Sequence, residues 1–164
     1  MLSKAVETAV KMETDAIRHY REAAGKTKHP IGRRTFESLV AEEQRHLKML
    51  KDILAGLDIE QVLSHPAPST KTVFSDLDRQ EAESVTATTD DMQALGIALD
   101  FEKKGYHFYL QNAAEATDMK EKALLARLAQ EEKRHFALLL EVERYVTTTG
   151  EWFIAEEQKL LDEL

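Results

Sequence analysis

The sequence predicts an all-α protein with a single domain over residues 1–164. The expected fold is a four-helix bundle of two antiparallel helix hairpins joined by a long crossover, with a short C-terminal helix. Apolar residues recur at spacings of three and four along four long segments, as they do in amphipathic helices. The stretch between the second and third segments, residues 58–90, lacks this spacing. The two halves also repeat each other, because six residues of the first half recur 89 positions later.

Composition places the 164-residue chain among globular proteins of ordinary domain size. Apolar residues make up 43% of it and charged residues 32%, so it can bury a core. Its formal charge of −8 argues against nucleic acid and anionic membranes as partners. No apolar run reaches the length of a membrane span and no targeting segment is visible, so we expect a cytoplasmic location. Without cysteine, the chain can form neither disulfides nor cysteine-held metal sites.

The first hairpin is expected to consist of helices over residues 3–25 and 31–56. The apolar stripe of the first helix is interrupted by one acid, Glu13. A turn follows, and Pro30 suits the first position of the second helix. On that helix, Glu43 and His46 fall where the next core residues are due. A carboxylate and an imidazole therefore point inward, one helical turn apart.

The crossover, about residues 58–90, is expected to run along the bundle from end to end. It is far longer than a median loop of about 4–6 residues. Two prolines within residues 65–70 break any helix, and the threonines of residues 86–89 form helices poorly. Short helical turns are expected within it, for example at residues 76–81.

The third helix is expected over residues 90–116, with Thr89 or Asp90 as its cap. Its apolar stripe is interrupted by a single acid, Glu102. This acid lies 89 residues after the lone acid of the first helix, so the second hairpin begins as the first one does.

The fourth helix is expected over residues 119–147. Thr117 or Asp118, followed by Glu121, resembles a capping box that opens it. Its apolar stripe carries a second inward Glu-x-x-His pair, Glu132 and His135. A short C-terminal helix over residues 151–163 is expected to pack on the bundle or on a second subunit.

Six inward polar residues are predicted to meet at mid-bundle. In each half the lone acid precedes the Glu of the Glu-x-x-His pair by 30 residues, so a short turn brings the two to the same height. Burying four unpaired carboxylates is costly, and no Lys or Arg lies on the stripes. Two divalent cations would neutralise the cluster. The predicted metal ligands are Glu13, Glu43, His46, Glu102, Glu132 and His135.

The donor set indicates the kind of metal. Carboxylate oxygen and imidazole nitrogen without thiolate suit iron or manganese, and zinc or cobalt is also compatible. Glu43 and Glu132 are placed to bridge two ions, with Glu13 and Glu102 as terminal ligands.

Polar residues beside the ligands have less distinctive patterns. Tyr20 and Tyr109 are either hydrogen-bond partners of the ligands or core aromatics. Residues off the stripes are expected on solvated faces, although either arginine could pair with a ligand carboxylate; they are Glu42, Glu131, Arg45 and Arg134. The remaining histidines are expected on the surface or in turns; they are His19, His29, His65 and His107.

These motifs resemble the rubrerythrin branch of the ferritin-like superfamily. The resemblance covers nearly the whole chain and rests on the long crossover and on Glu13-x6-Tyr20, Glu43-x-x-His46, Glu102-x6-Tyr109 and Glu132-x-x-His135. It implies a ferritin-like fold and a di-iron site, with peroxide reduction or dioxygen-dependent iron oxidation as the activity. Rubrerythrins proper also carry a rubredoxin-like domain with cysteine-held iron, which this chain lacks, so an external electron-donor protein is expected. They carry an extra carboxylate one turn from the third-helix ligand, where this chain has Leu99 and Gly105.

Three functions from different classes fit the sequence. The preferred one is a non-haem di-iron peroxidase or oxidase that reduces hydrogen peroxide or dioxygen, with two iron ions per chain. The second is a ferroxidase or iron-storage protein of the ferritin kind, although the long crossover fits poorly on the surface of a closed shell. The third is a structural bundle, metal-free or zinc-loaded, which leaves four buried acids unexplained. We expect a homodimer, and the sequence assigns no catalytic residue beyond the ligands.

Overall fold

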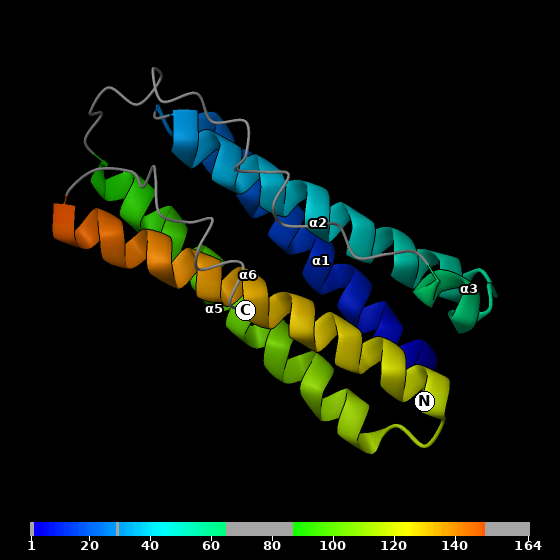
Figure 1. Cartoon of the computed structure of the whole chain (residues 1–164). Coiled ribbons are helices and arrows are strands. Elements are labelled where there is room, and N and C mark those ends of the chain that lie inside the picture. Colours follow the sequence, from blue (N-terminus) through cyan, green and yellow to red (C-terminus); the bar gives the residue numbers. More distant parts are fainter. Residues whose placement is uncertain (1, 29, 65–86, 150–164) are drawn as a thin grey trace.

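The structure is a computed structural model that describes residues 2–28, 30–64 and 87–149. In these ranges every regular element is a helix: α1 (Leu2–Lys26), α2 (Pro30–Leu54), α3 (Ile59–Leu63), α5 (Thr89–Glu115) and α6 (Met119–Thr149). The helices α1 and α2 form one antiparallel hairpin, α5 and α6 form the other, and the two hairpins lie side by side (Figure 1). The expected all-α bundle of two hairpins is confirmed. The expected helical turns at 76–81 and the helix over 151–163 lie outside the described residues.

The ends of the first hairpin's helices follow local chemistry. The backbone N–H of Thr27 donates to the Ala23 carbonyl (3.0 Å) and closes α1. Pro30 begins α2, where its missing N–H and fixed φ are no disadvantage. After α2 the chain turns at Gly56, whose φ of 90° is the left-handed region that favours glycine.

The second hairpin's helices both begin at side-chain caps. Thr88 caps α5, and Asp91 accepts from the Thr88 backbone N–H (2.8 Å) in a capping box. The expectation of Thr89 or Asp90 as the cap was therefore wrong, because only from Thr88 is the reciprocal acid three residues away. At α6, Asp118 accepts from the backbone N–H groups of Lys120 and Glu121, each at 2.9 Å.

The crossover begins with the five-residue helix α3, in a stretch where the sequence showed no helical periodicity. Five residues are too few to show a helical period, which is why the pattern missed it. Asp58 caps α3 by accepting from the Glu60 backbone N–H, and Ile59 and Val62 are buried against the bundle. Arg127 of α6 donates to the Leu63 carbonyl (3.0 Å), so α3 is also tied to the second hairpin.

The apolar core consists of two clusters, one toward each end of the bundle. The largest side chains of the first include Tyr20, Phe36 and Leu139. Those of the second include Tyr109 and Leu128. On each long helix the predicted metal ligands lie between the residues of one cluster and those of the other. Among the described helices, none combines the length and apolarity that crossing a membrane requires.

Candidate metal centre

The four long helices bring all six predicted ligands together at mid-bundle. Each side chain is buried although each is polar; the residues are Glu13 on α1, Glu43 and His46 on α2, Glu102 on α5, and Glu132 and His135 on α6. The periodicity explains this placement, because each residue occupies a core position of its own helix. The apolar clusters on either side shield the group from water.

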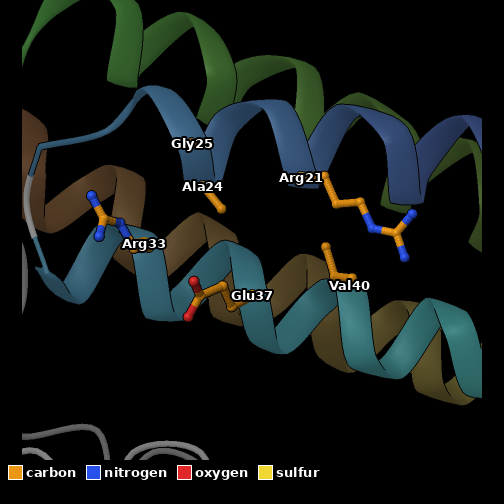
Figure 2. A pocket seen from close by; sticks show the side chains of 6 residues that line it. All are labelled: Arg21, Ala24, Gly25, Arg33, Glu37 and Val40. Carbon is orange, nitrogen blue, oxygen red and sulfur yellow. The ribbon is translucent and has the colours of Figure 1, made fainter.

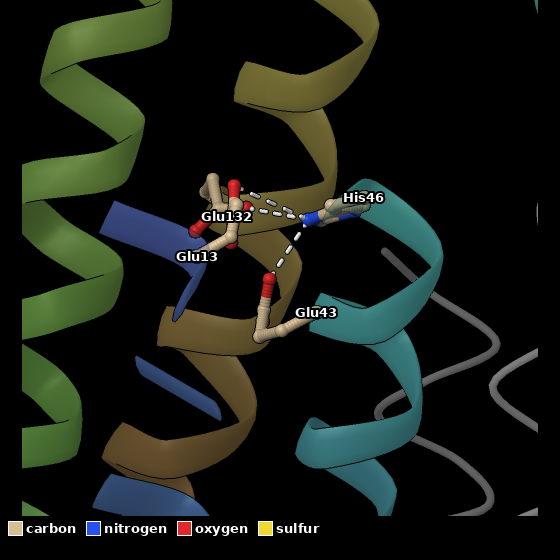
Figure 3. Close-up of side chains that lie close together, drawn as sticks. All are labelled: Glu13, Glu43, His46 and Glu132. Atoms are coloured by element: carbon tan, nitrogen blue, oxygen red, sulfur yellow. Dashed lines mark ion pairs between the residues drawn. The ribbon is translucent and has the colours of Figure 1, made fainter. Parts of the chain in front are cut away.

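The six residues form two overlapping groups, each able to hold one metal ion. Within each group, one ligand atom per residue lies within 4.8 Å of all the others. One group adds Glu13 and His46 to a shared pair of acids, and the second adds Glu102 and His135 to the same pair. The shared residues are Glu43 and Glu132, the two acids for which the sequence predicts a bridging role. Figure 3 shows the first group, with the carboxylates converging on His46 from three helices.

Both imidazole rings direct Nδ1 at the carboxylates. His46 Nδ1 lies 2.8 Å from Glu43 Oε2 and 3.1 Å from Glu132 Oε1. His135 Nδ1 lies 3.1 Å from Glu43 Oε1 and 3.3 Å from Glu102 Oε2. The two rings stack with centroids 5.7 Å apart. Each histidine can therefore give its Nδ1 lone pair to a cation between the carboxylates.

The atoms that face the centre have no hydrogen-bond partner among the described residues. They are both carboxylate oxygens of Glu43, Oε2 of Glu102, Oε1 of Glu132, and Nδ1 of His46 and His135. A buried polar atom left unpaired costs about 1–3 kcal/mol, so native proteins rarely leave several together. Metal ions would satisfy all of these atoms at once. The residues present therefore fit a pair of divalent cations.

In the metal-free protein, protons take over part of the cations' role. Burial, with repulsion from Glu43, raises the pKa of Glu13 and Glu132 well above its usual value. Burial would lower the pKa of His46 and His135, but the surrounding carboxylates raise it well above the usual value. Burial would likewise raise the pKa of Glu43, but the two histidines hold it well below. The centre thus retains protons when no cation is bound.

Two buried tyrosines hold the terminal carboxylates from the opposite hairpin. Tyr20 of α1 donates to Glu102 Oε1 on α5 (2.5 Å), and Tyr109 of α5 donates to Glu13 Oε1 on α1. Burial and the nearby carboxylates raise the pKa of both phenols well above the usual value, so they stay protonated. Tyr20 and Tyr109 are therefore hydrogen-bond partners of the predicted ligands, which was one of the two alternatives that the sequence left open.

Glu131 was expected on a solvated face, and this was wrong. Its side chain is buried, and its Oε2 lies 2.8 Å from His46 Nε2. Arg45 of α2 and Arg127 of α6 also donate to its carboxylate, the latter at 2.9 Å. Burial would raise the pKa of Glu131, but the hydrogen bonds from His46, Arg45 and Arg127 hold it well below its usual range. Glu131 lies off the apolar stripe of α6, but its side chain contacts α2. The periodicity of α6 alone does not reveal this contact.

Other off-stripe residues are partly enclosed as well. Arg45 and Glu42 were expected to be solvated, but both are half-buried and pair with each other at 2.7 Å. His19 was expected at the surface; it is half-buried, with Nε2 3.1 Å from the Ala94 carbonyl oxygen of α5. His107 is exposed, as expected. Arg134 keeps a large part of its side chain in solvent, and His29 and His65 lie outside the described residues.

A small cavity of about 120 Å³ reaches the centre between α1 and α5. Its lining includes Met12, Ala16, Phe101, Gly105 and the carboxylates of Glu13, Glu102 and Glu132. A Cβ atom at Gly105 would lie only 2.6 Å from Glu132 Oε2. Glycine is therefore needed there for Glu132 to keep its position.

A larger surface pocket of about 500 Å³ lies between α1 and α2 (Figure 2). Arg21, Arg33 and Glu37 line it with exposed charged side chains, next to Ala24 and Val40. None of the predicted ligands contributes to it, so it is separate from the metal centre.

Comparisons with known proteins identify a family and a fold. The family model described as Rubrerythrin matches residues 4–143. No curated protein matches the chain. One similar solved structure is a two-domain protein from Anabaena variabilis containing DJ-1/ThiJ/PfpI-like and ferritin-like domains. It has a TM-score of 0.66 and 15% sequence identity, and the match covers 90% of this chain but only 37% of that protein.

A second similar structure is a protein from Xanthomonas campestris pv. campestris. It has a TM-score of 0.64 and 18% identity, and the match covers 91% of this chain and 92% of that one. Likenesses at such low identity show the fold alone. With the family match, they confirm the ferritin-like four-helix bundle.

Proposed function

Because the chain belongs to the rubrerythrin family, we propose that it is a non-haem di-iron oxidoreductase that reduces hydrogen peroxide or dioxygen. One observation carries the proposal beyond the family. Six buried ligands form two overlapping groups that share Glu43 and Glu132, and the atoms facing the centre lack hydrogen bonds. A purely structural bundle would leave that arrangement without a purpose.

In this proposal, Glu13 and His46 hold one ion, Glu102 and His135 hold the other, and the shared acids hold both. Four carboxylates and two neutral imidazoles match the charge of two divalent ions. Oxygen and nitrogen donors without thiolate suit iron, and manganese or zinc is also compatible. When bound, a pair of ferrous ions supplies the two electrons that reduction of peroxide to water consumes.

The protein's own groups orient the ligands and hold protons beside them. Reduction of hydrogen peroxide to two water molecules also consumes two protons. Tyr20 and Tyr109 keep their phenolic protons within hydrogen-bond reach of Glu102 and Glu13. By engaging Oε1 of Glu102, Tyr20 leaves Oε2 of that residue facing the centre, near His135. The phenols thus fix the terminal carboxylates and place a proton at each.

The size of the cavity between α1 and α5 supports the proposal that the substrate is a small molecule. Its volume of about 120 Å³ is large enough for a few water-sized molecules and reaches three of the ligand carboxylates. Hydrogen peroxide and dioxygen are of this size. The buried surroundings otherwise exclude bulk water from the reacting atoms.

The electrons must be restored after each turnover. The chain contains no cysteine and hence no cysteine-held iron of its own. We therefore propose an external electron-donor protein as a partner. The homodimer and the cytoplasmic location stay predictions.

Dioxygen-dependent iron oxidation is a second candidate, favoured by the structure around Gly105. Rubrerythrins proper carry an extra carboxylate one turn from the third-helix ligand. Here Gly105 lies one turn after Glu102, and even a Cβ atom there would collide with Glu132. This departure from the rubrerythrin pattern favours iron oxidation by dioxygen over peroxide reduction.

Stopped-flow oxidation of the iron-loaded protein tests the proposal. Anaerobic protein loaded with ferrous iron should bind two ions and be oxidised faster than free ferrous ion in the same buffer. Faster oxidation by hydrogen peroxide identifies a peroxidase, and faster oxidation by air-saturated buffer identifies an oxidase or ferroxidase. The reaction should stop after one oxidation unless an electron donor is added. Oxidation no faster than that of free iron by either oxidant would contradict the proposal.

Ligand variants test the site itself. Glu43→Ala should lose both ions, because Glu43 belongs to both groups. Glu141→Ala, at a partly exposed position on α6 beside Arg144, is the control and should keep both. Elemental analysis after loading measures the result. Two ions retained by Glu43→Ala would contradict the bridging assignment.

A further inference from the structure

We propose that Glu131 is a positioning residue for His46 and makes the two metal positions unequal, with the position of Glu13 and His46 binding its ion more tightly. This inference rests on the metal centre of the proposed function. The inference goes beyond that function, because neither the donor set nor the repeat of 89 residues distinguishes the two metal positions. The observation that carries it is a buried contact outside the six ligands.

The contact fixes the orientation of the His46 ring. His46 is fully buried, with Nδ1 directed at Glu43 and Glu132 and Nε2 lying 2.8 Å from Glu131 Oε2. A cation bound at Nδ1 leaves the N–H on Nε2, where it donates to Glu131. A carboxylate that accepts from a ligand imidazole fixes its tautomer and raises its basicity, which strengthens the metal bond.

Both hairpins hold the Glu131 carboxylate in place. Arg45 reaches it from α2, and Arg127, one turn earlier on α6, donates to it through Nε at 2.9 Å. Arg127 also donates to the Leu63 carbonyl of α3, so its own position is restrained. Two guanidinium groups donate to the buried carboxylate, and a third, that of Arg134, lies 4.0 Å from it. Glu131 therefore presents a fixed carboxylate oxygen to Nε2 of the His46 ring.

Among the described residues, the second metal position has no contact of this kind. By the repeat of 89 residues, the counterpart of Glu131 is Glu42 and the counterpart of Arg127 is Ser38. Glu42 pairs with Arg45 at 2.7 Å instead of turning to His135. Within the described part of the chain, no carboxylate contacts His135 Nε2. Ser38 cannot anchor Glu42 as Arg127 anchors Glu131, and Arg134, the counterpart of Arg45, also lies near Glu131, at 4.0 Å. The two halves of the repeat therefore differ around these acids.

Cobalt titration of the metal-free protein tests the inequality. Anaerobic titration with Co²⁺, followed by visible absorption and calorimetry, should show two steps with the first tighter by about tenfold or more. Glu131→Gln should weaken the first step by about 10–100-fold and bring it close to the second. The control is Glu22→Gln, the same change at an exposed position of α1 outside this network, which should leave both steps as they are.

A spectroscopic measurement identifies the position that fills first. In protein labelled with ¹⁵N-histidine, one equivalent of Zn²⁺ should shift the ring resonances of His46 before those of His135. The His46 Nε2–H proton should be protected from exchange with water, and this protection should disappear in Glu131→Gln. Loss of a merely structural contact would not change the order in which the two rings shift.

The outcomes separate this inference from the proposed function. If the unmodified protein takes up no cobalt, the metal centre itself is wrong. If it binds two ions but Glu131→Gln leaves both steps and the order of filling unchanged, only the role of Glu131 is wrong. Should Glu131→Gln fail to fold by circular dichroism, Arg127→Gln loosens the same carboxylate without removing it. That variant should weaken the first step alone, and an unchanged first step would overturn the inference.

Discussion

At the scale of single residues, the candidate centre includes a close contact between Glu132 and Gly105. Glu132 is one of the two shared acids, and its carboxylate packs against the backbone of α5 at Gly105. Any side chain at that position must displace either the carboxylate or the helix. A glycine in mid-helix is otherwise unfavourable, so the metal centre gives a reason for its presence.

Gly105→Ala is expected to weaken metal binding. The new Cβ would lie 2.6 Å from Glu132 Oε2, and this carboxylate would have to leave its position between the two groups. The matched control is Gly96→Ala on the same helix, where a Cβ would meet nothing within 4 Å. That control should bind metal normally and gain about 0.5–1 kcal/mol of stability from its better helix propensity.

Elemental analysis and urea denaturation of the two glycine variants give the comparison. Full metal content in Gly105→Ala would show that Glu132 tolerates displacement and that its contact with α5 has no role in binding.

At the scale of elements, the helices begin where a side chain can satisfy their first backbone N–H groups. The start of α5 shows this, because a capping box forms from Thr88 and Asp91. The helix that carries Glu102 is thereby fixed at its N-terminal end, beyond the crossover. The local interaction of these two residues therefore determines where the long helix α5 begins.

Thr88→Ala is expected to destabilise the protein by about 0.5–2 kcal/mol, because it leaves an N–H of the first turn without its acceptor. Thr89→Ala changes the same residue type one position later, inside the helix, and should have a much smaller effect. Urea denaturation of the metal-free forms measures the difference. A larger loss of stability in Thr89→Ala than in Thr88→Ala would show that Thr89 is the cap.

At the scale of the whole molecule, the two hairpins are joined through their polar centre. Tyr20 and Tyr109 each donate to an acid of the other hairpin, and Glu131 joins α6 to Arg45 and His46 of α2. Residues more than 80 positions apart in the sequence therefore meet at the predicted metal ligands. Folding stability and metal binding should consequently be linked.

The stability of the metal-free protein should fall from mildly acidic to neutral pH. Glu13, Glu132, His46 and His135 all have a pKa raised above the usual value. Such groups stabilise the fold below their unfolded pKa, about 4.3 for Glu and 6.5 for His, and this contribution is lost as pH rises through the folded pKa. Glu43 and Glu131, with lowered pKa values, act in the opposite sense and lose their contribution only in stronger acid.

Thermal melting of chelated and iron-loaded samples measures this linkage. The loaded protein should melt higher at neutral pH, and the gap should narrow in mild acid, where protons compete with the metal. Glu13→Gln should flatten the pH dependence of the metal-free form, whereas Glu22→Gln, at an exposed position of α1, should not. Equal melting of chelated and loaded samples at neutral pH would mean that metal does not bind at the buried acids.

The amino-acid sequence alone predicted the four long helices, their pairing into hairpins and the six inward residues. Apolar spacing assigns a side chain such as Glu13 or His46 to the inner face of its own helix, and this information is local. The repeat of 89 residues then placed the two halves in corresponding roles. The short helix α3 was not predicted, because five residues are too few to show a helical period.

Which neighbours these residues meet depends on how the helices pack against one another. Glu131 lies off the stripe of α6 yet is buried, because α2 brings Arg45 and His46 against that side of the helix. The fit of Gly105 under Glu132 likewise depends on the distance between α5 and α6. The rotation and separation of two helices arise from the packing of all their side chains together, so the periodicity of one helix does not contain them.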